Sequence, residues 1–419
     1  MKELRNLPAE PEDFTASADG QLILMRGIDR EKGRARLYLF DVRNPRSAQE
    51  VASDGKPGTE SLHPIEFAVG TVGPGILAFS AQDGQGDSLY VRRYRVNAKE
   101  GKPPSIDLGK LRKLAITASG GRKFIQIADP AFSADGSHIA FSALVAGDAQ
   151  SDVWVASAEG GEARRLTNDP YVERDLHWGP DGIYVASDAT DHGLLNLFRI
   201  DAGTGEKVRL TTAPHNDRHP YAQADGSVLY ASDSDGKVDL YLLKDAQIRR
   251  VTDFTTGLSS PAPAPKARGI FATTFNSGRF RLVEVPKSAW QESQPVAVGP
   301  AAGPPLEIPR AEWPEQPKDY EAFAMKNWRP EGGYVFGGGA GNTVAGRAAV
   351  LFSDLLRDNQ LYVDLAVYGS FDYTQGLFLY ENRSHRYGLV LGGFHYVQQN
   401  LDSLDPNLVY YQRDFGLVG

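Results

Sequence analysis

The chain has 419 residues, 41% of them hydrophobic and 23% charged, so it is long enough for more than one folded unit and has the composition of a globular protein. With 44 glycines, 26 prolines, 18 tyrosines and 19 phenylalanines, it favours many turns and short aromatic strands over long helices. The net charge of −8 argues against a nucleic-acid-binding surface, and the lack of cysteine excludes disulfides, thiolate catalysis and cysteine-ligated metals.

The N-terminal stretch MKELRNLPAEPEDF has no apolar core of the kind found in signal peptides. No run of about 18 apolar residues occurs anywhere, which excludes a transmembrane helix but not a membrane barrel built from strands. Residues 2–8 read as a short strand. That strand either completes the last sheet of a closed ring or is the tail of a sheet lost upstream.

A strand–turn–strand unit recurs over the first 300 residues. Its best-preserved copy is DPAFSADGSHIAFSA (129–143), in which an Asp-Gly turn joins two apolar runs. Clear copies lie at 13–27, 175–188 and 219–233, and degenerate ones at 63–81 and 260–275. A third apolar strand follows each pair, and a short fourth strand closes most units. The predicted units span residues 10–57, 58–119, 120–169, 170–214, 215–254 and 255–299.

Four-stranded antiparallel sheets repeated in units of about 40 to 65 residues are typical of β-propeller blades, because each sheet buries both faces against its neighbours. DPAFSADGSHIAFSA…DVWVASAEGGEARRLT (129–167) resembles the TolB-like propeller repeat nearly position for position. The resemblance covers roughly residues 10 to 300 and implies an all-β, six-bladed TolB-like propeller. For function it implies partner binding, substrate gating or scaffolding.

One residue of each unit stands at the start of the innermost strand. Because innermost strands line the central channel of a propeller, we expect these residues to form a ring at one channel mouth. They are Asp13, His63, Asp129, Asp175, His219 and Ser260. Such a ring could bind a basic group of a partner or a divalent cation such as calcium, although no cofactor is required by the pattern. The alternative is structural, with these side chains hydrogen bonding to the backbone of neighbouring blades.

Other polar residues are predicted to have structural roles. Asp233, Asp235 and Asp239 in SDSDGKVD resemble part of a calcium-binding loop but lack its remaining ligands, so a turn between strands is expected. His138, His177 and His192 lie beside turns or within strands and are predicted to be surface or packing residues.

The chain is predicted to be non-catalytic. It contains no G-x-S-x-G nucleophile elbow, no H-E-x-x-H zinc motif and no cysteine. TolB-like propellers also precede the hydrolase domain of prolyl oligopeptidases, so a catalytic domain outside these residues stays open.

After residue 286 the chain becomes rich in proline, which indicates an extended linker, assigned to 300–332. Its first part, 294–298, is expected to supply the outer strand of the sixth blade. Alternating strands follow in 333–419, at 345–354, 359–369, 374–384, 386–399 and 407–416. In the second of these, Leu361, Val363, Leu365 and Val367 share one face. Strands of this kind suit a transmembrane barrel or, alternatively, an amphipathic sheet on a core.

The elements FSDLL…NQLYVDL and YENR…RYGL…FHY, within about 340–419, resemble the start of the outer-membrane surface-antigen barrel related to BamA. A barrel needs at least eight strands, so the resemblance implies an incomplete barrel-like sheet and a chain that is a fragment or truncated product.

The favoured interpretation is a non-catalytic interaction or scaffold propeller of the bacterial envelope, periplasmic and tethered to the outer membrane. Its expected partner is another envelope protein or an exported polypeptide. The alternatives are the accessory, substrate-steering propeller of a peptidase and a metal- or sugar-binding propeller.

Overall fold

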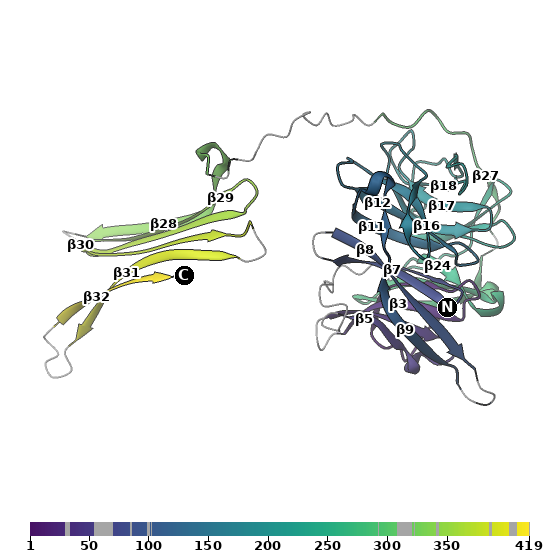
Figure 1. Ribbon diagram of the computed structural model, residues 1–419, viewed down its shortest axis with the longest axis horizontal. Coiled ribbons are helices and arrows are strands. Elements are labelled where there is room, and N and C mark those ends of the chain that lie inside the picture. The colour runs from purple at the N-terminus through teal and green to yellow at the C-terminus, as the bar shows by residue number, and fades with distance from the viewer. Residues whose placement is uncertain are drawn as a thin grey trace. The chain divides into compact units, whose positions relative to one another are not determined.

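Figure 1 shows the computed structural model. It describes residues 1–29, 34–53, 70–83, 86–98, 101, 103–291, 293–307, 321, 323–340, 343–384, 388–401 and 409–418. The chain divides into two compact units, Met1–Ala311 and Glu312–Gly419.

In the first unit, the described residues form six antiparallel blades. The first blade is β2 (Glu10–Ala16), β3 (Leu22–Asp29), β4 (Arg34–Asp41) and β5 (Gln49–Ser53). The second is β6 (Thr71–Gly73), β7 (Ile76–Asp83), β8 (Gly86–Asn97) and β9 (Ser105–Lys113). The third is β11 (Phe124–Phe132), β12 (His138–Val145), β13 (Ser151–Ser157) and β15 (Arg164–Arg165). The fourth is β16 (Glu173–Gly179), β17 (Gly182–Ser187), β18 (Asn196–Ile200) and β19 (Lys207–Arg209).

The fifth blade is β20 (Asp217–Ala222), β21 (Val228–Ser232), β22 (Asp239–Lys244), β23 (Gln247–Arg250) and β27 (Val296–Ala297), and the sixth is β24 (Ser259–Pro263), β25 (Gly269–Asn276), β26 (Arg279–Pro286) and β1 (Lys2–Glu3). Smaller elements are the parallel pair β10 (Ile116–Thr117) and β14 (Gly161–Glu162), and the 3-10 turns η1 (Pro45–Ser47), η2 (Ser119–Gly121), η3 (Pro265–Ala267), η4 (Lys287–Ala289) and η5 (Met325–Asn327).

The sixth blade is closed by the N-terminus, as one of the two sequence alternatives requires. Lys2 lies opposite Glu284 in the β1–β26 register, and the Leu4 N–H donates to the Leu282 carbonyl at 2.9 Å. Residues 294–298 do not supply the outer strand of the sixth blade, so that expectation is wrong. β27 pairs with β23 of the fifth blade, because the outer edge of the sixth blade is already occupied by β1.

The core of the first unit lies between blades. Its described buried apolar residues form six clusters, each drawn from two adjacent blades. One of them joins Phe14, Ile23 and Phe40 of the first blade to Phe271 and Leu282 of the sixth. The ring is therefore held by apolar contact on both faces of every blade, which confirms the propeller expected from the repeat.

The second unit is one antiparallel sheet in the order β28 (Trp328–Ala340), β29 (Thr343–Asp354), β30 (Asn359–Asn382), β31 (Leu389–Leu401) and β32 (Val409–Val418). β28 begins at Trp328, inside the stretch assigned to a linker. β30 doubles back, because Tyr380 and Asn382 both donate hydrogen bonds to the Asn359 side chain, at 2.5 and 2.7 Å. Its two limbs correspond to the strands expected at 359–369 and 374–384.

The register of this sheet separates two faces. Ala348 lies opposite both Val335 and Leu365, Val350 opposite Val363, and Phe352 opposite Leu361. Together with Phe378, Leu391, Phe415 and Leu417 of the later strands, these residues form what we call the apolar face. The other face carries polar groups, including an ion pair between Arg347 and Asp364 at 2.5 Å. Among the described residues, no helix has the length and apolar character needed to cross a membrane.

Candidate functional site

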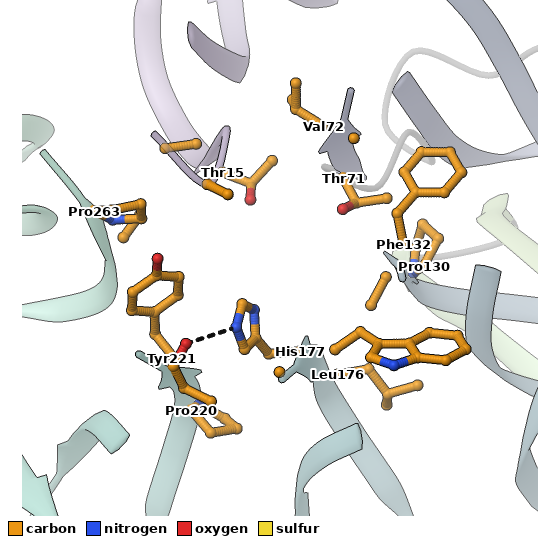
Figure 2. Close-up of a pocket in the computed structure, with 18 of the residues that line it drawn as sticks. Thr15, Thr71, Val72, Pro130, Phe132, Leu176, His177, Pro220, Tyr221 and Pro263 are labelled. Carbon is orange, nitrogen blue, oxygen red and sulfur yellow. Dashed lines mark hydrogen bonds between the residues drawn. The ribbon is translucent and has the colours of Figure 1, made fainter. Parts of the chain in front are cut away.

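A cavity of about 450 Å³ runs along the axis of the propeller and is lined by the innermost strands β2, β6, β11, β16, β20 and β24. Figure 2 shows side chains from these strands pointing into it. Five of the six expected ring residues line this cavity: Asp13, Asp129, Asp175, His219 and Ser260. The sixth, His63, lies outside the described residues.

The ring position coincides with a β-bulge in the innermost strand. The strand register shifts between Ala128 and Ala131, and Asp129 between them has a φ of 49°. The same shift surrounds Asp175 (φ 58°), His219 (φ 51°) and Ser260 (φ 53°), whereas on β2 it falls between Pro11 and Asp13. Asp and His tolerate this left-handed conformation better than most residues, and a bulge redirects its side chain. The bulges therefore bring these polar side chains to the channel mouth.

Two of the carboxylates also connect neighbouring blades. Asp129 Oδ2 accepts a hydrogen bond from the Asp175 N–H at 2.7 Å, and Asp175 Oδ2 accepts one from the His219 N–H at 3.1 Å. Arg218 binds both oxygens of Asp175, at 3.0 and 3.1 Å. Asp129 and Asp175 thus hydrogen bond to the backbone of a neighbouring blade, as in the structural alternative raised by the sequence, and Asp175 has both carboxylate oxygens engaged.

Asp13 differs from these two residues. Its Oδ1 accepts a hydrogen bond from the adjacent Phe14 N–H at 2.8 Å, and among the described residues no neighbouring blade donates to it. The side chain is exposed to the cavity but surrounded by protein walls. Asp13 is therefore the carboxylate most accessible to a ligand in the channel.

The electrostatics of the mouth follow from burial and from like charges. Burial, reinforced by the charges of Asp129 and Asp175, raises the pKa of Asp13 to about 6. Burial together with Asp175 raises the pKa of Asp129 to about 6 as well. For Asp175 burial acts in the same direction, but His219 and Arg218 outweigh it and hold its pKa below the usual value. At neutral pH the mouth is therefore anionic. Ionising these buried, neighbouring carboxylates costs free energy, and an incoming cation would lower that cost.

The described residues do not form a ready metal site. No three His, Asp or Glu side chains within the described part of the chain converge closely enough to hold an ion. The mouth is a negatively charged surface whose carboxylates are spread over different blades.

His177 lines the cavity and is packed there against a neighbouring ring, which is one of the two roles expected from the sequence. Its ring lies 4.7 Å from that of Tyr221, and its Nε2 lies 3.3 Å from the Ala222 carbonyl oxygen (Figure 2). Burial lowers the pKa of His177 to about 4 and raises that of Tyr221 to about 12, so both rings are neutral at pH 7. The sequence already indicated that His177 lines the cavity, because His177 and Tyr221 each stand two residues after a ring position.

The other two histidines lie away from the cavity. His138 is exposed beside the turn of the third blade, and its Nδ1 lies 2.8 Å from Ser137 Oγ. His192 contacts Thr190 and Arg209 in a loop of the fourth blade.

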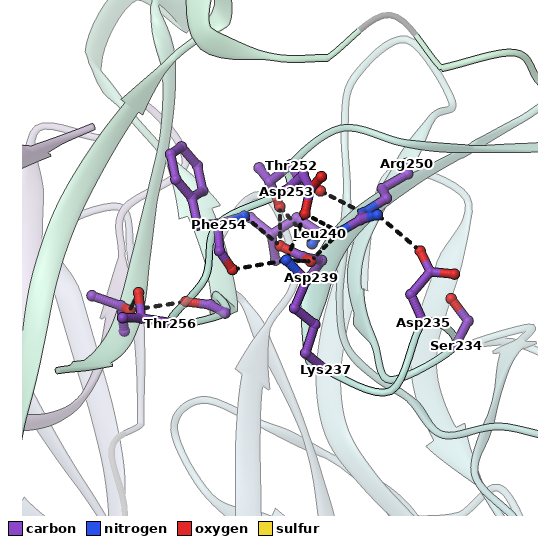
Figure 3. Close-up of polar contacts among 12 residues, drawn as sticks. Ser234, Asp235, Lys237, Asp239, Leu240, Arg250, Thr252, Asp253, Phe254 and Thr256 are labelled. Atoms are coloured by element: carbon purple, nitrogen blue, oxygen red, sulfur yellow. Dashed lines mark hydrogen bonds and ion pairs between the residues drawn. The ribbon is translucent and has the colours of Figure 1, made fainter.

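Asp235 and Asp239 of SDSDGKVD are held in a polar cluster within the fifth blade (Figure 3). Asp233 instead accepts hydrogen bonds from the N–H and the side-chain amide of Asn216, at 2.8 and 2.9 Å. Asp239 is fully buried and accepts hydrogen bonds from Arg250 at 2.6 Å and Thr252 at 3.1 Å. Asp235 accepts one from Tyr241 at 2.8 Å. An equivalent cluster in the third blade consists of Asp152, Arg165 and Thr167. These groups fasten the outer strands to one another, so this feature of the repeat is structural.

Comparison with known proteins places these observations in a family context. Residues 122–298 match the family model described as the TolB beta propeller domain, which identifies this part of the chain as a TolB-like propeller. The chain is also similar to the uncharacterized peptidase YuxL of Bacillus subtilis (strain 168), with 27% identity over 147 residues. This match covers 33% of the chain and only 20% of that relative's length.

The chain is also similar to solved structures, among them the following two. TolB from Acinetobacter baumannii is 16% identical with a TM-score of 0.43, over 63% of each chain. The β-propeller domain of the Trilobed protease from Pyrococcus furiosus is 11% identical with a TM-score of 0.40, over 71% of this chain and 99% of that one.

Proposed function

From a TolB-like propeller with an anionic channel mouth, we propose that the protein is a polypeptide-binding module of the bacterial cell envelope. Its partner is another envelope protein or an exported polypeptide, which presents a basic side chain or a terminal amine to the channel. The observation that carries this proposal is the Asp13 carboxylate, which faces the cavity beside Asp129. A cation placed there lowers the cost of ionising both carboxylates.

The walls below the mouth suit the stem of a cationic side chain. Neutral aromatic rings, including Tyr221 and His177, can contact its carbon atoms, and an aromatic face attracts its charge. Thr15, Thr71 and Tyr221 bring hydroxyl groups to the same cavity (Figure 2). A cavity of about 450 Å³ accepts a side chain or chain end, so the remainder of a partner would rest on the mouth.

A pair of peptides tests this proposal. One is a short Gly-Ala peptide with a single central lysine, and the other is the same peptide with that lysine acetylated. We expect the free lysine to bind, and either acetylation or Asp13→Asn to weaken binding at least about tenfold, roughly 1.4 kcal/mol. Asp135→Asn, at an exposed turn, is the matched control. Equal affinity for the two peptides would remove the proposal.

We further propose that the second unit attaches the protein to the outer membrane as part of a surface-antigen type of barrel. Support comes from the apolar face, where Val335, Phe415 and Leu417 are 79%, 72% and 92% exposed. A continuous apolar face this open normally contacts a partner or lipid. In the source bacterium, the tagged protein is expected to fractionate with the outer membrane, and release by high salt alone would contradict attachment through this face.

The second candidate function is the substrate-steering propeller of a peptidase. It is favoured by the match to a peptidase of Bacillus subtilis, and the same channel would then admit the basic segment of a substrate. Casein cleavage by the full product of the native gene distinguishes the two functions: cleavage supports the peptidase, and its absence supports the binding module.

A further inference from the structure

The hairpin of β8 and β9 extends beyond the end of its blade. The Tyr94 hydroxyl donates to the Gly73 carbonyl at 2.7 Å and its N–H to the Gly75 carbonyl at 3.0 Å, so Tyr94 is level with the turn between β6 and β7. Strand pairing continues past this level, with Arg95 opposite Asp107 and Asn97 opposite Ser105. In Figure 1 the hairpin projects from the propeller near the label β9. The hairpin leaves the propeller at the end of the blade where β6 turns into β7, whereas the ring that contains Asp13, Asp129 and Asp175 lies at the other end.

Cationic side chains gather on this hairpin, although the chain as a whole has a net charge of −8. Arg93, Arg95, Lys110 and Arg112 are all exposed, and we call this set the basic arm. Arg93 and Arg112 share one carboxylate, that of Glu159, at 2.7 and 3.2 Å. A single acid cannot neutralise two guanidinium groups, so the pair keeps a positive charge and donor groups for an anion.

The basic arm borders an apolar cavity of about 500 Å³. Ile76, Val91 and Leu111 line this cavity together with Arg93, Lys110 and Arg112. Cations beside an apolar floor match a ligand that carries a phosphate on a hydrocarbon stem. A nucleic acid would use the cations alone and would leave the apolar lining of the cavity uncovered.

We propose that the basic arm docks on a membrane surface through anionic phospholipid headgroups. The phosphate lies among Arg93, Lys110 and Arg112, and the start of the acyl region lies over Ile76 and Val91. Arg95, farther out on the hairpin, contacts a neighbouring headgroup. Because the arm leaves the turn end of the propeller, the channel mouth stays accessible to a polypeptide while the arm is bound. This surface is separate from the channel and from the apolar face of the second unit.

The full chain is tested with vesicles of phosphatidylcholine, with or without about 30% phosphatidylglycerol, since anionic lipid supplies the attraction. We expect tighter partitioning into the anionic vesicles and a loss of this preference at high salt. Each cation near the surface contributes about fivefold, so Arg95→Glu with Lys110→Glu should reduce the preference at least about 25-fold. Both positions are exposed, and the variant is expected to keep the unfolding transition of the parent protein.

The control variant is Arg279→Glu with Lys287→Glu, which reverses two exposed cations on the sixth blade. It should keep the preference for anionic vesicles. Attachment through the apolar face would give binding to vesicles of pure phosphatidylcholine. That binding is therefore measured separately from the preference for anionic vesicles. An unchanged preference in the arm variant, or equally tight binding of a single-stranded DNA, would overturn the proposal.

Discussion

The two units use the same antiparallel architecture but cover their sheets differently. In the propeller, β17 and β21 are buried at every position, because a neighbouring blade lies on each face. In the second unit the apolar face remains open, with Leu365 53% and Phe378 51% exposed. The comparison shows that a blade obtains its core from its neighbours, whereas the described residues of the second unit leave one face of their own sheet uncovered.

The largest expected effect comes from truncating one phenylalanine in each unit. Phe141 is fully buried between the second and third blades, so Phe141→Ala should destabilise the propeller by about 3–5 kcal/mol. Phe415→Ala on the open face should cost within about 0.5 kcal/mol in water. Urea unfolding followed by tryptophan fluorescence measures both. Similar losses of stability in the two variants would mean that Phe415 is covered as fully as Phe141, which would contradict an open face.

Charges on the apolar face should affect membrane binding before they affect folding. Leu365→Asp with Phe378→Asp is expected to abolish flotation with phosphatidylcholine vesicles, since each charge costs up to about 2–4 kcal/mol within a bilayer. The matched change on the other face, Tyr362→Asp, should cost less. Undiminished flotation of the double variant would contradict lipid contact at this face.

The ionisation of Asp129 should give the propeller a characteristic pH dependence. Its folded pKa of about 6 lies above the unfolded value of about 3.9, so the native state binds more protons between these values. Stability from this group is therefore greatest below about pH 4 and falls as pH rises from about 4 through 6, by up to about 3 kcal/mol.

Asp129→Asn keeps an oxygen for the Asp175 N–H but removes the charge. We expect it to flatten the pH profile of unfolding and to raise stability at pH 8. A variant that stays parallel to the parent protein at every pH would contradict the assigned titration.

Metal titration is expected to give the smallest effect, because the described ring residues are spread over separate blades. Calorimetry with calcium and zinc should give no saturable heat that depends on the ring. Heat that disappears in both Asp129→Ala and His219→Ala would restore the metal-binding alternative.

The sequence predicts the propeller well because each blade carries the same turn and the same apolar runs. Aligned turns also give aligned strand starts, and five of the six residues chosen in this way line the cavity. The sequence does not predict the bulges, because the alternation of side chains along a strand does not reveal an extra residue such as Asp129. β28 is missed because EGGYVFGGGA is rich in glycine, which is unfavourable in strands. The pairing of β27 depends on which blade edge is vacant, and no local pattern encodes that.

The central claim is that the carboxylates at the channel mouth receive a cation. Calorimetry of the lysine peptide in buffers of different ionisation enthalpy tests it most directly, because cation binding lowers the pKa of Asp13 and Asp129. The account predicts proton release on binding near pH 6, none at pH 8, and a reduced release in Asp13→Asn. Binding without proton release at pH 6 would contradict it.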